Sequence, residues 1–121
     1  MNLLLFKSRF FYFMNTLIKN RIEEVKALCE KLRVDKLWIF GSANSSNFTE
    51  ESDIDFLVSF EDLQIEDYAE NYFLLAENLE EIFTRSVDLV TVKSLSNPYF
   101  IEEVNKSKSL IYDRQSQEIF I

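Results

Sequence analysis

The hydrophobic and polar positions of this 121-residue chain alternate between helical and extended spacing. Apolar residues recur every three or four positions in two long segments, which predicts amphipathic helices. Shorter apolar runs between them predict strands. We expect helices over residues 16–33 and 65–83, and a shorter one over 97–105 in which Pro98 occupies the first turn. Strands are expected over residues 36–40, 53–60, 87–92 and 110–112.

This order of elements predicts an α+β fold, layered in the α/β manner, with a small mixed sheet of about four strands and helices packed on it. A further short helix is expected in the polar stretch after Gly41-Ser42. The chain has one glycine and one proline, which argues against a turn-rich all-β sandwich. Its length is that of a single domain.

The first thirteen residues are apolar but are interrupted by Lys7 and Arg9. They are too short to span a bilayer and lack the pattern of a signal peptide. Met14 is an alternative start, because a well-patterned helix follows it. We therefore expect a domain over residues 14–121 and an N-terminal extension, residues 1–13, outside the fold. A weak membrane-surface anchor is the alternative function for the extension, and the expected location is the cytoplasm.

Composition narrows the possible chemistry. The chain has no histidine, which excludes Ser-His-Asp triads and His-based zinc sites. Its single cysteine, Cys29, lies on an apolar helical stripe and is expected to be a buried, inert thiol. The net charge is −8, and residues 50–88 carry thirteen acidic residues against one basic residue, Arg85. Such an acidic segment does not suit direct DNA binding, which requires Lys and Arg to neutralise phosphates.

Two short motifs are candidates for a functional site. Asp53 and Asp55 are two residues apart on a predicted strand, so their side chains point to the same side. Two neighbouring carboxylates repel each other, and a divalent cation relieves that repulsion. The glycine of Gly41-Ser42 permits a tight turn and close approach to a ligand. Taken singly, the motifs also fit a hydrated strand end and an ordinary turn. Separated by ten residues, they predict adjoining phosphate and metal sites.

A third carboxylate, Asp88, lies near the start of the apolar strand over residues 87–92. A charge is unfavourable there unless it is exposed or has a partner. If this strand neighbours residues 53–60, Asp88 completes a cluster with Asp53 and Asp55. The alternative is an ordinary Asp on an edge strand.

These motifs resemble the DNA polymerase beta-like nucleotidyltransferase superfamily, and in particular its minimal nucleotidyltransferases. The segment FGSANSSNFTEESDIDFLV carries the resemblance, with the later Asp88. The resemblance implies the polymerase beta-like nucleotidyltransferase fold. It implies that Asp53, Asp55 and Asp88 bind two Mg²⁺ ions and act in catalysis, and that Gly41 and Ser42 hold the triphosphate of ATP. Relatives often carry an Arg soon after Gly-Ser, where this chain has Asn44, so Lys36 or a partner is expected to help with the phosphates.

The resemblance also implies a biological role. Minimal domains of this family act as antitoxins of small helical HEPN-type ribonuclease toxins, and some transfer AMP to a tyrosine of the toxin. Two alternatives stay open: an antitoxin that only binds its toxin, and a transferase for a small molecule such as an aminoglycoside. Several aromatic and apolar residues fit either a partner surface or the core, namely Phe73, Leu74, Phe83, Tyr99 and Phe100.

Overall fold

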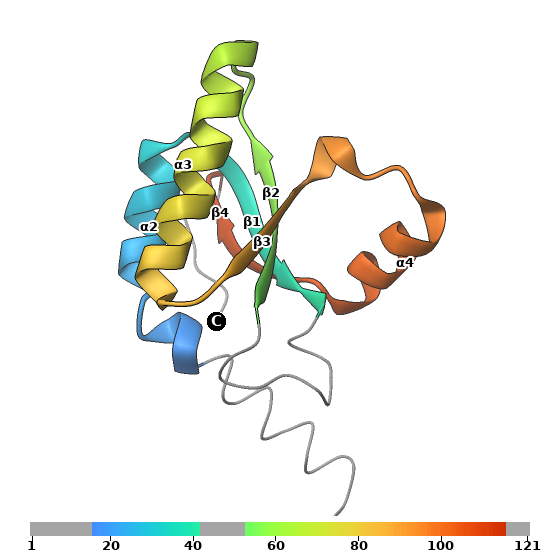
Figure 1. Ribbon diagram of the computed structural model, residues 1–121, viewed down its shortest axis with the longest axis horizontal. Helices are drawn as coiled ribbons and strands as arrows, with labels where there is room; N and C mark the ends of the chain where they lie inside the picture. Colours follow the sequence, from blue (N-terminus) through green and yellow to red (C-terminus); the bar gives the residue numbers. More distant parts are fainter. Residues whose placement is uncertain (1–15, 42–52, 116–121) are drawn as a thin grey trace, which may run out of the picture.

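The computed structural model describes residues 16–41 and 53–115, which form a four-stranded sheet with helices on both faces (Figure 1). The predicted α+β class is confirmed. After a short helical turn at residues 16–19, the elements are α2 (Ile22–Lys31), β1 (Val34–Phe40), β2 (Ile54–Phe60), α3 (Ile65–Phe83), β3 (Val87–Thr91), the 3-10 turn η2 (Val92–Ser94), α4 (Pro98–Ser107) and β4 (Ser109–Asp113).

The order of strands across the sheet is β3-β2-β1-β4. Strand β1 runs antiparallel to both of its neighbours, whereas β2 and β3 are parallel. Two parallel strands need a long crossover connection, and the nineteen-residue α3 supplies it. This crossover brings the starts of β2 and β3 to the same end of the sheet, where Asp55 and Asp88 lie on the strands and Asp53 immediately precedes β2.

The two faces of the sheet carry different helices. Figure 1 shows α2 and α3 against one face and α4 beside the other. The larger core lies under α2 and α3, where Phe56 is fully buried and its ring stacks on that of Phe83 at 5.9 Å between centroids. The smaller core lies on the α4 face and consists of Phe40, Leu57 and Val104. The sheet is therefore covered on both sides, but less completely on the α4 side.

The first helical segment departs from the prediction. It is not one helix over residues 16–33, because the chain turns at Asn20 and Arg21 before α2 begins. There the amide of Arg21 bonds the carbonyl of Ile18, three residues back, at 3.0 Å. The apolar stripe is nevertheless buried as expected. Cys29 has no exposed surface, and burial raises the pKa of its thiol to about 12, so it is inert.

Helix α4 begins as the sequence predicts. The side chain of Asn97 accepts hydrogen bonds from the amides of Tyr99 and Phe100, and Pro98 occupies the first turn, where no amide proton is needed. No described helix is long and apolar enough to cross a membrane. Residues 1–13 lie outside the described residues.

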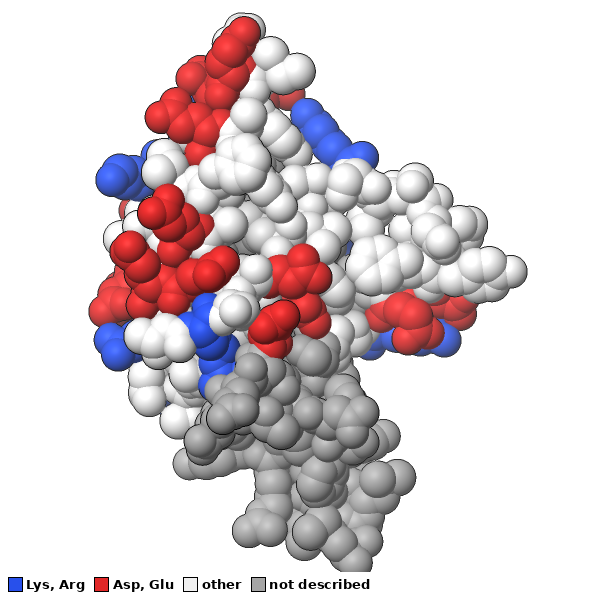
Figure 2. All heavy atoms as spheres, in the orientation of Figure 1, with Lys and Arg blue, Asp and Glu red and all other residues white. Residues whose placement is uncertain are grey.

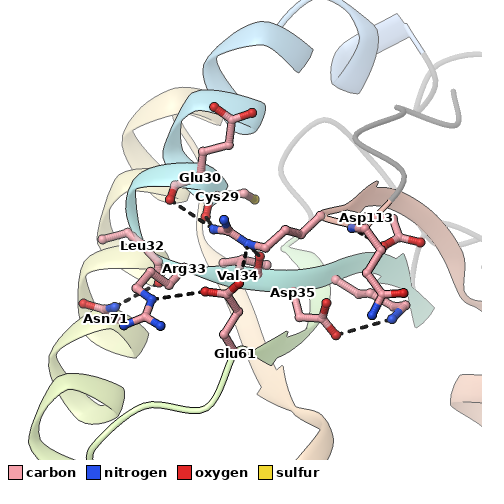
Figure 3. Close-up of polar contacts among 12 residues, drawn as sticks. Cys29, Glu30, Leu32, Arg33, Val34, Asp35, Glu61, Asn71 and Asp113 are labelled. Atoms are coloured by element: carbon pink, nitrogen blue, oxygen red, sulfur yellow. Dashed lines mark hydrogen bonds and ion pairs between the residues drawn. The ribbon is translucent and has the colours of Figure 1, made fainter.

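Arg114 ties the end of β4 to the end of α2, and Figure 3 shows its partners Glu30, Val34 and Glu61. Its guanidinium donates to the carbonyl of Glu30 at 3.1 Å and to that of Val34 at 3.0 Å. It also forms an ion pair with Glu61, at 3.2 Å, and Glu61 pairs with Arg33 as well. A helix end leaves carbonyl groups without helical partners. Arg114 therefore satisfies acceptors at the end of α2 from a distant part of the chain.

Replacing Arg114 with Ala is expected to lower the free energy of unfolding by about 1–3 kcal/mol, because several carbonyls lose a charged donor. Urea denaturation of both proteins measures this change. The matched control is Arg21→Ala, which removes an exposed ion pair with Glu24 and should cost less than about 0.5 kcal/mol. Equal losses in the two variants would contradict the role given to Arg114.

Candidate active site

The register of the sheet places Asp55 beside Asp88. The two residues are direct partners in the parallel pairing of β2 and β3. Asp55 shares a face with Leu57, two residues along the strand, and Leu57 packs against Val104 of α4. The pair of carboxylates therefore lies on the sheet face that carries α4. Asp53 comes immediately before β2, at the same end of the sheet.

The electrostatics agree with this proximity. Partial burial raises the pKa of Asp88, and the negative charges of Asp55 and then Asp53 raise that pKa further. Each effect disfavours the charged form of Asp88. The carboxylates of Asp55 and Asp53 are thus close enough to Asp88 to raise its pKa.

Gly41 lies against the carboxylate of Asp55. The residue before it, Phe40, pairs directly with Asp55 across β1 and β2. Gly41 has a φ of +73°, a left-handed conformation that glycine adopts at low cost. A Cβ atom at this position would lie 2.6 Å from Oδ2 of Asp55. The missing side chain therefore makes room for the carboxylate.

The backbone amide of Gly41 is bonded to α4. It donates to Oγ of Ser107 at 3.1 Å, and the Ser107 hydroxyl donates to the carbonyl of Glu103 at 3.0 Å. Sequence reasoning missed Ser107, which is 66 positions from Gly41. Its neighbours Lys106 and Lys108 gave no pattern that could have singled it out.

The predicted metal site is only partly visible in the described residues. Within residues 16–41 and 53–115, no group of three or more His, Cys, Asp or Glu side chains is arranged to hold a metal ion. The donor chemistry nevertheless fits a divalent cation, because Asp55 and Asp88 place two hard oxygen ligands side by side. Ser42, the other residue predicted to hold the triphosphate, lies outside the described residues.

The suggested help from Lys36 is wrong. Lys36 lies four residues before Phe40 on β1, roughly 13 Å away at the usual rise per residue, and its ammonium bonds Asp35 at 3.3 Å. The position of Arg85 follows from its neighbour Ser86, whose carbonyl accepts a hydrogen bond from the amide of Ile54, the first residue of β2. Arg85 therefore lies at the end of the sheet where β2 and β3 begin.

Replacing Asp88 with Asn is expected to raise the melting temperature slightly in the presence of a chelator, by roughly 1–2 °C at neutral pH. The change removes a mostly exposed carboxylate that Asp55 and Asp53 repel. A raised pKa means that the folded protein binds a proton more readily than the unfolded chain does. The wild type therefore gains stability as pH falls through that pKa, and the difference between the proteins should shrink. Melting curves across pH measure it, and a difference that grows on acidification would contradict this electrostatic account.

With this geometry in view, comparison with known proteins identifies the family. The family model described as polymerase beta nucleotidyltransferase matches residues 23–117, which is most of the chain. The chain belongs to this nucleotidyltransferase family. Its sheet, with helices on both faces, is the polymerase beta-like nucleotidyltransferase fold that the sequence predicted.

Individual relatives of this nucleotidyltransferase agree with the assignment. It is 40% identical over 87 residues to a Methanocaldococcus jannaschii protein named "Putative protein adenylyltransferase MJ1379", covering 72% of this chain and 84% of the relative. A solved structure of a "putative minimal nucleotidyltransferase" is 29% identical, with a TM-score of 0.56, covering 76% of this chain and 90% of that one. A chain from the MntA–HpeT toxin–antitoxin, in a mutant crystal structure, is 25% identical, with a TM-score of 0.55 and coverage of 78% and 73%.

Some of the aromatic and apolar residues predicted to lie either in the core or on a partner surface are buried, and the others are exposed. Phe83 belongs to the core and is 4% exposed. The side chains of Phe73 and Leu74 on α3, and of Tyr99 and Phe100 on α4, are exposed. A shallow hollow of about 500 Å³ lies beside Phe73 and is lined by Ala76 and three glutamates of α3, and Figure 2 shows acidic side chains gathered over this helix.

Proposed function

We propose that this nucleotidyltransferase uses Mg²⁺ to transfer AMP from ATP to a tyrosine hydroxyl of a HEPN-type toxin, and so acts as its antitoxin. The observation that carries the proposal is the pairing of Asp55 with Asp88, beside the backbone of Gly41. This arrangement puts two carboxylates and a glycine turn, which has no side chain to block a ligand, at one end of the sheet. A metal–nucleotide complex needs both features together.

In this proposal Asp53, Asp55 and Asp88 hold two Mg²⁺ ions, and Gly41 and Ser42 contribute to binding of the triphosphate. Bound magnesium would neutralise charge on the phosphates and on the attacking and leaving oxygens. The protein's own residues fix where this happens. Asp55 is held on a central strand between β1 and β3, so its carboxylate has a defined position next to Asp88.

The proposed reaction is a displacement at the α-phosphorus of ATP. The hydroxyl oxygen of the acceptor forms a bond to the α-phosphorus, and the bond from that phosphorus to the oxygen bridging to the β-phosphorus breaks. Pyrophosphate leaves with the electron pair of the broken bond. Asp88 accepts the hydroxyl proton, since the chain has no histidine to act as base.

Two lines of support favour a protein acceptor. The relative from Methanocaldococcus jannaschii is named as a protein adenylyltransferase, and the MntA–HpeT structure is of a toxin–antitoxin. The described surface also carries exposed aromatic residues on α3 and α4, of which Tyr99 is 81% exposed. Exposed aromatic side chains are frequent in protein–protein interfaces. Such a surface suits an antitoxin that holds its toxin while it modifies it.

A binding-only antitoxin is the second candidate, because the described residues contain no ready-made group of three metal ligands and the chain lacks the Arg after Gly-Ser. A small-molecule transferase is the third. Its support is the acidic surface over α3, which would attract a cationic aminoglycoside.

A transfer assay separates these candidates. The protein is incubated with Mg²⁺, ATP labelled in the α-phosphate and a HEPN-type toxin as the candidate partner. Label on that partner, lost in the double variant Asp53→Asn/Asp55→Asn, is the result expected. A stable complex that never acquires label would leave only the binding-only antitoxin. Label on an added aminoglycoside, and not on protein, would transfer the function to drug modification.

A further inference from the structure

The feature that the proposed function leaves unused is the bond between the glycine turn and the last turn of α4. The amide of Gly41 donates to Oγ of Ser107, and that hydroxyl donates to the carbonyl of Glu103. The second bond fixes the rotamer of Ser107, because a hydroxyl that donates to the carbonyl four residues back presents its lone pairs in a set direction. Ser107 therefore meets Gly41 as an oriented acceptor.

The packing around this bond makes the turn and α4 one unit. Phe40, immediately before Gly41, packs against Val104 of α4, and its ring meets that of Phe100 edge-on, with 6.1 Å between centroids. On its other side, the turn touches the carboxylate of Asp55. Any shift of Gly41 relative to α4 would therefore also change the space left for that carboxylate.

From these contacts we propose that Ser107 is a positioning residue, whose hydroxyl holds the Gly41 backbone so that the Asp55 carboxylate stays in place for the metal–nucleotide complex. The proposal rests on the proposed function and deepens it. It also gives the Gly41 amide a partner within the protein, the hydroxyl of Ser107. Because that amide is bonded to α4, Gly41 supports the proposed triphosphate site through the space that it leaves beside Asp55.

A matched pair of substitutions tests the hydroxyl alone. Ser107→Thr keeps Oγ and adds a methyl group, whereas Ser107→Val has nearly the same shape as the threonine variant and lacks the hydroxyl. Gly41 is the only glycine in the chain, so labelling with ¹⁵N-glycine gives one amide signal in an NMR spectrum. Its hydrogen exchange and shift report directly on the bond to Ser107.

Before nucleotide is added, the Gly41 amide is expected to be protected in the wild type and in Ser107→Thr, and to exchange about tenfold faster or more in Ser107→Val. Titration with Mg²⁺ and AMP-PNP, with no acceptor present so that no AMP is transferred, should then give a dissociation constant about three- to tenfold higher for Ser107→Val, and near the wild-type value for Ser107→Thr. In the transfer assay, KM for ATP should rise in the same proportion and kcat should change less. Melting curves establish that both variants are folded.

The outcomes separate the two proposals. Equal exchange and equal affinity in the threonine and valine variants would overturn the role of Ser107 and leave the proposed function intact. A Gly41 signal that becomes protected only when Mg²⁺ and AMP-PNP are added would also overturn it, because the amide would then be a phosphate donor. A wild-type protein that does not bind Mg²⁺ and AMP-PNP at all would overturn the proposed function, and the positioning role with it.

Discussion

Asp55→Asn is expected to reduce transfer of AMP by on the order of a thousandfold or more, the largest effect of any single substitution in this chain. The amide nearly matches the carboxylate in shape, so the core around Phe56 and Leu57 should be undisturbed. It carries no charge, however, and is a poorer ligand for a hard divalent cation. Transfer rates with ATP labelled in the α-phosphate measure the change directly.

The matched control for Asp55→Asn is Asp62→Asn. Asp62 is exposed in the connection between β2 and α3, away from the paired carboxylates. Both variants lose one negative charge, so an effect of net charge on nucleotide binding would appear in both. We expect Asp62→Asn to keep transfer within about twofold of the wild type. If Asp55→Asn retained comparable activity, the assignment of the active site to the start of β2 and β3 would be wrong.

Gly41→Ala is expected to have the second-largest effect on the transfer of AMP. The folded state should be destabilised only moderately. The left-handed conformation of Gly41 costs an alanine about 1–2 kcal/mol. The new Cβ would lie 2.6 Å from Oδ2 of Asp55, a distance that real Cβ contacts do not show. Because the Asp55 side chain can rotate, the protein should still fold, but with its carboxylate displaced. We expect loss of transfer by about a hundredfold, with a melting temperature lower by several degrees.

Gly41→Asn separates backbone strain from the contact with Asp55. Asparagine tolerates the left-handed region better than alanine but carries the same Cβ atom. Its melting temperature should therefore lie above that of Gly41→Ala, while its transfer activity should be equally low. Activity that recovered together with stability would show that strain in the turn, and not the position of Asp55, limits the reaction.

The strands that carry Asp55 and Asp88 could be predicted from sequence, because apolar runs and residue spacing are local signals. The two-residue interval of Asp53 and Asp55 predicts a common side on one strand, and the apolar run around Asp88 identifies its strand. In the structure β2 begins at Ile54, so the common side of Asp53 and Asp55 stays a prediction. The prediction that Asp88 meets Asp55 depended on which strands are neighbours, a property that periodicity does not contain. The sheet order places β3 beside β2 and satisfies that condition.

Other features could not be predicted because they depend on contacts between distant segments. The bond of Ser107 to Gly41 and the bonds of Arg114 to the end of α2 join residues more than 60 positions apart. The sequence also left open whether Phe83 belongs to the core or to a partner surface, because a helical stripe does not reveal which of its residues contacts a sheet. In the structure its ring reaches Phe56 and completes the core. The apolar stripe continues unbroken past Asn20, so the sequence pattern gave no sign of the turn that interrupts the first helix there.

The central claim is that Asp53, Asp55 and Asp88 form a divalent metal site for a nucleotide. It is tested most directly by titrating Mn²⁺ into the protein with AMP-PNP present and measuring bound Mn²⁺ by electron paramagnetic resonance. The wild type and Asp62→Asn are expected to bind Mn²⁺ together with the nucleotide, whereas Asp55→Asn and Asp88→Asn should bind at least about tenfold more weakly. Equal Mn²⁺ binding in all four proteins would contradict the claim.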